Sequence, residues 1–300
     1  KRCIVINRMM INPQKFYLTW LYLLFYLASC GGGSGASIVY LPPVFSNDYS
    51  EITSLEGSKD IVTIIAVDTN NRPVMHSIVG GSDEELFIMS SNGVLKFLTQ
   101  PNYEAPLDLD ANNIYHISIE AAAGNNITLL DVSISVKDAF EGRVVDGPLV
   151  GALIFIDTND NFILDSNEKS TTSDSEGFFY INKESLTCDA ACNQNVIAQA
   201  GFDSQSNRTS NLFLVAPLDI NKIINVTPLS TLIQASSDYA SLLKALNISQ
   251  TKNDILTKDI WSLAKEGESA SKSLMRVNLQ IGMILTAAQN LLSSKPDLDV

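Results

Sequence analysis

An oxygen-rich segment near the middle of the chain has the residue types and the spacing of a cation-binding loop. Residues 157–168 read DTNDNFILDSNE and combine carboxylates with carboxamides. A hard cation such as Ca²⁺ takes about six to eight oxygen ligands, which a tight loop can supply from alternate positions. The segment therefore predicts a calcium site. Its predicted ligands are the side chains of Asp157, Asn159, Asn161, Asp165 and Glu168 and the backbone carbonyl of Ile163.

These positions resemble the calcium loop of the EF-hand family, in which Glu168 would be the bidentate ligand. The residues before the loop, ALIFI, predict a strand where the family has a helix. Phe162 stands where the family has glycine, and a bulky residue at positive φ is sterically unfavourable. We expect the loop to deviate at Phe162. An Asn/Asp-rich turn without metal is the alternative interpretation.

The stretch 46–140 alternates strand-like runs with turn residues. β-Branched residues and a period of about two indicate strands, and Gly, Asn and Asp between them indicate turns. Short strands at this spacing predict a Greek-key β-sandwich. The predicted strands are 60–68, 74–79, 93–98, 114–122 and 127–136.

The motifs LEGS, PNYE and KDAFEG in this stretch resemble those of a cadherin repeat. The resemblance implies an adhesion domain outside the cell that binds Ca²⁺. Phe140 and Gly142 stand where the family has asparagines, so part of the usual ligand set is missing. A calcium-free sandwich with acidic loops is the alternative. The implied ligands are Glu56, Asn102, Glu104, Asp138 and Glu141, with Asp108 and Asp110 from an acidic insert.

The segments VVDGPLVGA and TTSDSEGFF within residues 141–216 resemble small prealbumin-like or carboxypeptidase-regulatory-like sandwiches. This resemblance implies a second, non-catalytic β-sandwich that carries the calcium loop. Within it we expect a β-hairpin around Gly177 as the left-handed residue.

Residues 217–300 predict helices, with Thr227 as a cap and Pro228 at the first helical position. Apolar residues at helical spacing between Leu274 and Leu292 predict one core-facing stripe. The predicted fold class is mainly β with a C-terminal α region, which we expect to be the start of a longer domain.

The N-terminal residues have the pattern of an export signal. Residues 1–29 contain basic residues and then the apolar run FYLTWLYLLFYLA, and LASC follows at residues 27–30. LASC resembles the lipobox of bacterial lipoproteins, which implies cleavage before Cys30 and acylation of that cysteine. A plain signal peptide with an incidental cysteine is the alternative. We expect a lipid anchor with a flexible linker at 30–45, a bacterial cell envelope location, and the outer membrane because Gly31 follows the cysteine.

Cysteine usage agrees with export. Cys188 and Cys192 predict a disulfide that closes a small loop, with free thiols or a metal site as alternatives.

Charge and motifs exclude several function classes. The chain has 33 acidic and 20 basic residues and a net charge of −13, which disfavours nucleic acid as a partner. It has no glycine-rich phosphate loop, zinc-protease helix or nucleophile elbow, so we expect no enzyme. The sequence predicts a calcium-binding surface lipoprotein that acts in adhesion or as a scaffold, with a protein or glycan partner. The alternatives are a calcium-dependent carbohydrate-binding module, with Tyr103 and Phe162 as aromatic contacts, or the non-catalytic N-terminal part of a larger surface enzyme.

Overall fold

A computed structural model of the chain describes residues 39–186 and 194–293. The strands and helices described below all lie in one compact unit, residues 41–300. The predictions for the signal at 1–29, for Cys30 and for the Cys188–Cys192 disulfide lie outside the described residues. In the part of the chain that the structure describes, no helix is long and apolar enough to cross a membrane.

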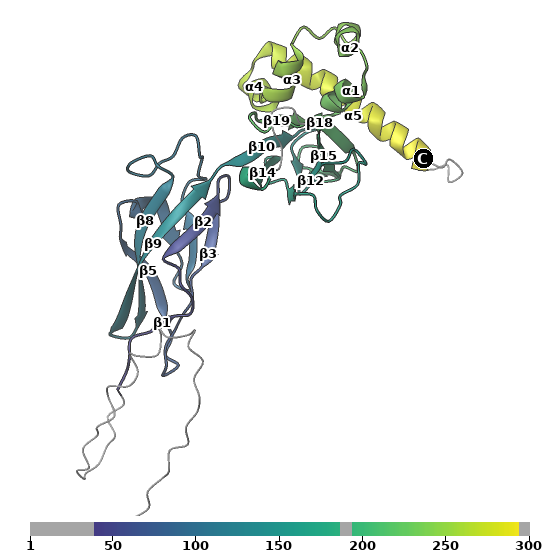
Figure 1. The fold of residues 1–300 in the computed structure, drawn as a ribbon. Helices are drawn as coiled ribbons and strands as arrows, with labels where there is room; N and C mark the ends of the chain where they lie inside the picture. The colour runs from purple at the N-terminus through teal and green to yellow at the C-terminus, as the bar shows by residue number, and fades with distance from the viewer. Residues whose placement is uncertain (1–38, 187–193, 294–300) are drawn as a thin grey trace, which may run out of the picture. The chain divides into compact units, whose positions relative to one another are not determined.

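The first β body consists of two facing sheets (Figure 1). One sheet has the order β2 (Glu51–Leu55), β9 (Asn126–Lys137), β8 (Ile114–Ala123) and β5 (Met75–Gly80). The other has the order β3 (Asp60–Thr63), β7 (Val94–Phe97) and β6 (Phe87–Met89), with η1 (Glu84–Leu86) before β6. The short strands β1 (Val44–Phe45) and β4 (Ala66–Val67) pair with each other. Strand β2 runs parallel to β9, and the other pairs within the two sheets are antiparallel.

Alternation along the strands explains this sandwich. In β8, Tyr115, Ile117 and Ile119 are buried, and the residues between them are less buried or exposed. The ring of Tyr115 packs edge-on against Phe87 and Phe97, with ring centroids 5.8 and 5.4 Å away. The predicted strands are confirmed, although 60–68 is divided into β3 and β4. Strands β2 and β6 were not predicted.

The second β body also has two main sheets around one core. Apolar side chains from both sheets are buried together, among them Phe140, Ile154 and Phe179. The first sheet has the order β14 (Phe178–Asn182), β10 (Ala139–Val144) and β19 (Ile224–Val226). The second has the order β13 (Ser170–Thr172), β12 (Leu153–Asp157), β15 (Asn195–Gln199) and β18 (Phe213–Pro217). A smaller sheet contains β11 (Leu149–Val150), β16 (Phe202–Asp203) and β17 (Arg208–Thr209), and η2 (Lys183–Ser185) follows β14.

The expected hairpin around Gly177 is only half right. Gly177 has the expected positive φ of 84°, and Asp174 and Phe178 close the turn with a backbone hydrogen bond of 2.8 Å. However, β13 pairs with β12 and β14 pairs with β10, so the two arms enter different sheets. The turn is therefore a crossover that connects one sheet to the other.

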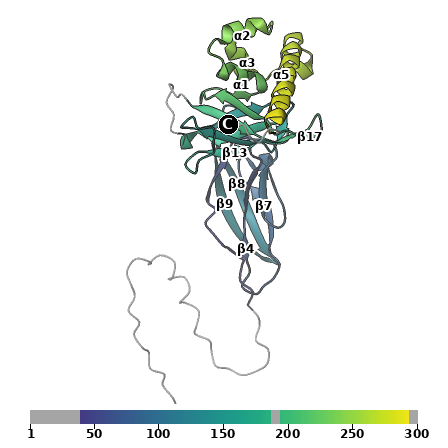
Figure 2. The ribbon, with the colours of Figure 1, turned by 90° about the vertical axis from the view of Figure 1, so that its right-hand side faces the viewer.

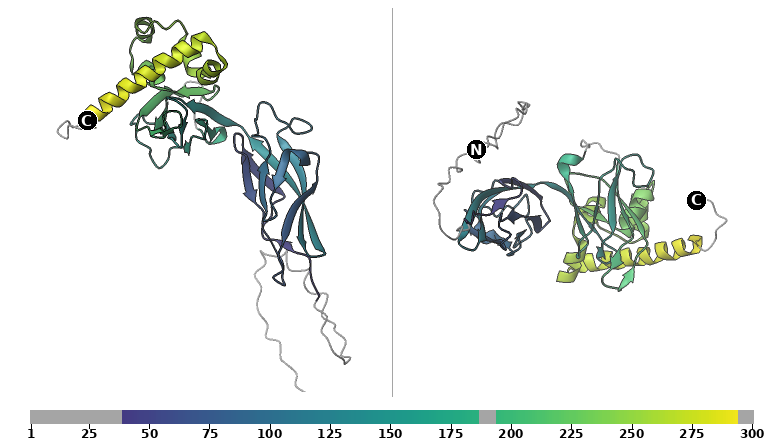
Figure 3. Two further views of the ribbon diagram at one scale, coloured as in Figure 1. Left: turned by 180° about the vertical axis from the view of Figure 1, so that it is seen from behind. Right: turned by 90° about the horizontal axis from the view of Figure 1, so that it is seen from below.

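Five helices complete the described chain and pack beside the sheets of the second body (Figures 2 and 3). As predicted, Thr227 caps α1 and Pro228 begins it. The helices are α1 (Pro228–Ala235), α2 (Tyr239–Ala245), α3 (Lys252–Thr257), α4 (Ile260–Glu266) and α5 (Ser269–Ser293).

The stripe on α5 contacts the core only as far as Leu285, which packs against two buried clusters. Leu274 and Ile281 are buried, whereas Ile284 and Leu291 are 68% and 66% exposed. The predicted core stripe is therefore wrong for the end of α5, which extends past the sheets (Figure 3).

Candidate metal centre

Glu56 is a buried carboxylate that connects three segments. It follows β2, and its backbone N–H donates to the carbonyl of Lys137 at 3.1 Å. Its Oε1 accepts a hydrogen bond from the backbone N–H of Ala139 at 2.6 Å, and its Oε2 accepts one from that of Tyr103 at 2.8 Å. The residue is 1% exposed. The fold therefore fixes the position and orientation of this carboxylate.

Glu104 and Glu141 bring two further carboxylates to Glu56. Glu141 lies on β10, and Glu104 lies in the loop between β7 and β8. One carboxylate oxygen from each of these residues lies within 4.8 Å of the others, and we call this group the glutamate triad. Among the described residues no other group of three acidic, histidine or cysteine side chains meets so closely. Ca²⁺ binds oxygens at about 2.3–2.6 Å, so two ligands of one ion are separated by at most about 5 Å. The triad fits that limit.

Burial makes the charge of the triad unfavourable. Burial, followed by the carboxylates of Glu56 and Glu104, raises the pKa of Glu141 to about 7. Burial also raises the pKa of Glu56, although the N–H groups of Tyr103 and Ala139 act in the opposite direction. Carboxylates that share one site resist full ionisation. A divalent cation would remove this repulsion, so the electrostatics of the triad suit a metal.

A cavity of about 280 Å³ adjoins the triad, and its lining includes Asn102, Glu104 and Glu141.

Asp138 precedes β10, and its two carboxylate oxygens have different surroundings. Its Oδ2 accepts a hydrogen bond from the Nζ of Lys183 at 2.9 Å, whereas its Oδ1 is buried without a hydrogen-bond partner. A buried oxygen without a donor is unfavourable unless a cation or water satisfies it. The triad offers only oxygen atoms as ligands, and the Oδ1 of Asp138 lacks a hydrogen-bond partner. Both features fit a hard cation.

Asp108 and Asp110 are not brought into the triad. The carboxylate of Asp108 accepts the backbone N–H groups of Asn112 and Asn113, at 2.7 and 3.3 Å. Asp110 accepts the side-chain amide of Asn112 at 2.8 Å. Both acids therefore hold the turn that precedes β8.

The loop 157–168 is a second oxygen-rich site, and its carboxylates accept hydrogen bonds from N–H groups of the same loop. Buried Asp157 accepts backbone N–H groups, including that of Phe162 at 2.9 Å. Glu168 is also buried, and it accepts the N–H of Thr158 at 2.7 Å and that of Asp165 at 3.1 Å. The Oδ2 of Asp165 accepts the side-chain amides of Asn159 and Asn161, each at 2.8 Å. The side chains of Asn159, Asn161 and Asp165 thus meet one another, whereas Asp157 and Glu168 accept hydrogen bonds from backbone N–H groups of the loop.

The expected deviation at Phe162 is not found. Phe162 adopts a φ of 60°, the left-handed conformation that glycine adopts easily at this position. A non-glycine residue meets a steric penalty of about 1–2 kcal/mol there. The ring of Phe162 contacts Phe213, with centroids 6.0 Å apart, and this packing offsets part of the penalty.

Two neighbours of the triad were missed by the sequence analysis. Tyr180 pairs with Glu141 across β10 and β14, and its ring lies against Gly57, which has a φ of 76°. Any Cβ at Gly57 would overlap that ring, so only glycine allows this approach. Lys183 is the second neighbour. No motif in the sequence indicates either residue, because each reaches the triad from a segment far along the chain.

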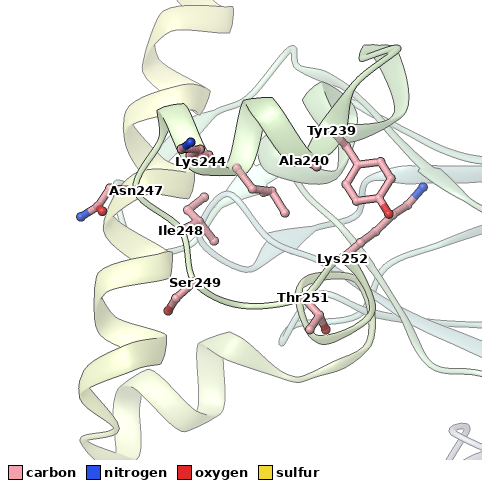
Figure 4. Close-up of a pocket in the computed structure, with 9 residues that line it drawn as sticks. Tyr239, Ala240, Lys244, Asn247, Ile248, Ser249, Thr251 and Lys252 are labelled. Atoms are coloured by element: carbon pink, nitrogen blue, oxygen red, sulfur yellow. The ribbon is translucent and has the colours of Figure 1, made fainter.

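The helices contain a different kind of hollow. A cavity of about 470 Å³ lies beside α2 and the start of α3 (Figure 4). Its lining includes Tyr239, Lys244 and Lys252 and no acidic residue, and the ammonium of Lys252 lies 5.0 Å from the centre of the Tyr239 ring. Without carboxylates it does not suit a metal ion.

No protein-family model matches the chain. Solved structures similar to it include EC1-4 of Drosophila N-cadherin, at 16% identity and a TM-score of 0.28 over 59% of this chain and 49% of that one. The chain thus spans about half the length of the N-cadherin fragment. Human protocadherin-24 EC1-2 matches at 12% identity and a TM-score of 0.29, over 60% of this chain and 99% of that one. Mouse clustered PcdhgC3 EC1-3 matches at 20% identity and a TM-score of 0.27, over 33% of this chain and 35% of that one. These TM-scores are too low to support an argument about the fold. The fold is therefore described from the strand order and from the core that each pair of sheets encloses. That architecture is mainly β with a C-terminal helical region, and the predicted fold class is confirmed.

Proposed function

We propose that the chain is a calcium-binding cell-surface module, with the glutamate triad as its main metal site. The observation that carries this proposal is the meeting of Glu56, Glu104 and Glu141 within 4.8 Å, with Glu56 almost fully buried. Three carboxylates are a poor structural group by themselves, because burial and repulsion oppose their charge. They are a good ligand set for Ca²⁺.

The bound ion would act mechanically. Glu56 is already hydrogen-bonded to the backbone of Tyr103 and Ala139, Glu104 belongs to the loop before β8, and Glu141 belongs to β10. One ion held by the three carboxylates would tie these segments together. Loss of the ion would restore the repulsion and loosen the same segments. Calcium would therefore stiffen the chain rather than take part in a reaction.

The wider role that we propose is adhesion or scaffolding at a bacterial cell envelope. Acylation of Cys30 would tether the chain to the outer membrane, and the acidic loops would face an exterior where free calcium is plentiful. A surface protein or glycan is the proposed partner. The oxygen-rich loop 157–168 would supply a second calcium site.

Calorimetric titration with Ca²⁺ and thermal unfolding with and without EDTA test the metal site. We expect saturable binding, a higher melting temperature in calcium, and loss of most of that increase in Glu141→Gln. Glu85→Gln, an exposed glutamate before β6, is the matched control and should bind as the unchanged protein does. Unchanged melting in millimolar calcium, together with no heat of binding, would refute the proposal.

A second candidate is calcium-dependent carbohydrate binding. Phe162 is 44% exposed within the oxygen-rich loop, so its ring could stack on a sugar while an ion there orients hydroxyl groups. Glycan-array binding that requires calcium and disappears in Phe162→Ala would favour this candidate. Retained binding in that variant would exclude the loop as the sugar site.

A further inference from the structure

Lys183 is held against the acidic residues from two directions. It begins η2, and its backbone N–H donates to the carbonyl of Asp138 at 3.2 Å. Its Nζ donates to the Oδ2 of the same residue at 2.9 Å. The side chains of Lys183 and Asp138 are only 28% and 26% exposed. The ammonium is thus positioned by the backbone as well as by its ion pair.

This lysine also lines the cavity beside the triad, together with Glu104 and Glu141. The cavity has a second lysine in its lining, Lys222, but the Nζ of Lys222 pairs with Asp219 at 2.9 Å. Lys183 is therefore the cavity lysine whose charge is paired with an acid of the predicted calcium site.

An ammonium on a tethered side chain and a metal ion compete for the same oxygens. To bridge two ions, Asp138 would have to offer one carboxylate oxygen to each. Lys183 already occupies Oδ2, which leaves only the buried and unpartnered Oδ1 for a metal. The four carboxylates of Glu56, Glu104, Asp138 and Glu141 then face one fixed positive charge. When ionised, these groups carry four negative charges and one positive charge, a net charge of −3, so one divalent ion leaves −1, whereas a second would make the site positive and face repulsion from Lys183.

We propose that Lys183 is a built-in counter-ion that occupies the place of a second metal ion and limits this acidic site to one divalent cation. This inference rests on the proposed calcium function of the triad. It assigns Lys183 as a residue that determines how many ions bind and how tightly, since its charge opposes any cation that approaches Asp138.

Lys183→Gln tests the assignment because it removes the charge and keeps a polar side chain that is one atom shorter. Removal of one positive charge from a partly buried site should strengthen Ca²⁺ binding by about tenfold. It should also free both oxygens of Asp138, so that one more ion binds than in the unchanged protein. Lys183→Arg keeps the charge and should preserve the original number of ions. Lys222→Gln is the matched control, because it removes a lysine of the same cavity that is paired elsewhere.

Isothermal titration with Ca²⁺ gives both the affinity and the number of ions. Glu141→Gln should bind fewer Ca²⁺ ions per chain than the unchanged protein. The difference counts the ions bound by the triad separately from those bound by the loop 157–168, and we expect it to be one ion. Unchanged binding in Lys183→Gln, or an equal gain in Lys222→Gln, would overturn the role of Lys183 and leave the calcium site standing. Absence of Ca²⁺ binding in the unchanged protein would instead overturn the proposed function itself. Far-UV circular dichroism of each variant confirms that altered binding does not reflect unfolding.

Discussion

Glu141→Gln should change the stability of the protein in opposite directions with and without calcium. The pKa of Glu141 rises from 4.5 to about 7 in the folded chain, first through burial and then through Glu56 and Glu104. One pKa unit corresponds to about 1.4 kcal/mol, so ionisation at pH 8 costs the folded state up to about 3 kcal/mol. Because the side chain is only part buried, water screens the charges, and we expect about 1–2 kcal/mol. Glutamine removes this cost while nearly keeping the shape.

The pH dependence follows from the direction of the shift. A carboxyl group with a raised folded pKa binds more protons in the folded state than in the unfolded state. Its protonation therefore favours folding at low pH, and this advantage is lost as the pH rises from about 4.5 to about 7. In EDTA, Glu141→Gln should be more stable than the unchanged protein at pH 8 and nearly equal to it at pH 4.5.

Calcium should reverse the order. A ligand at about a hundred times its dissociation constant stabilises the folded state by about 2.7 kcal/mol. The unchanged protein gains this stability and Glu141→Gln loses most of it, so in calcium the variant should be the less stable of the two. Urea unfolding followed by circular dichroism measures both orders. A variant that is less stable in EDTA at pH 8 would refute the reasoning, because it would show that the charge of Glu141 is favourable without metal.

Two further predictions concern the contact between the second body and α5. Burial, followed by the charge of Asp203, raises the pKa of Asp146 to about 7. Asp146→Asn should therefore stabilise the protein at pH 8 by about 1–2 kcal/mol and have little effect near pH 4. Equal effects at both pH values in urea unfolding would contradict this prediction. Asn278 is fully buried, and its side chain donates to the carbonyl of Val145 and accepts from the N–H of Leu229, each at 3.0 Å. Asn278→Ala leaves both backbone groups unpaired and should lower the free energy of unfolding by about 2–4 kcal/mol, whereas a loss below about 1 kcal/mol would mean that water replaces the amide.

Local patterns were sufficient to predict most of the fold. Alternation predicted β8 and β9 because one side of each strand faces the core shared by both sheets. A cap followed by proline predicted the start of α1 for the reason seen in the structure, since Thr227 accepts the N–H of Ser230 at 3.0 Å. Strand β2 was missed because its short segment EITSL is mostly polar, and pairing with β9 decides its conformation. The exposed end of α5 was missed because a helical period indicates an apolar face but not what covers it.

Phe162 illustrates a local rule that the surrounding structure overrides. Sterics alone disfavour its positive φ, and the prediction of a deviating loop followed from that. The N–H of Phe162 donates to the buried carboxylate of Asp157, and its ring rests against Phe213 on β18. The contact with Phe213 cannot be foreseen from the loop sequence, because the position of Phe213 depends on the pairing of β15 with β18.

The acidic residues of the triad could be predicted from motifs, but the lysine beside them could not. Glu56, Glu104 and Glu141 lie in segments whose order resembles a known pattern, whereas Lys183 lies in η2 after β14 and has no motif of its own. Its place beside Asp138 depends on the pairing of β14 with β10, which aligns Asn182 with Ala139. That register carries the next residue, Lys183, to Asp138, where its backbone and its side chain both donate hydrogen bonds. Under the proposed calcium function, the number of ions that the site would hold depends on this strand register, which the acidic motifs alone do not reveal.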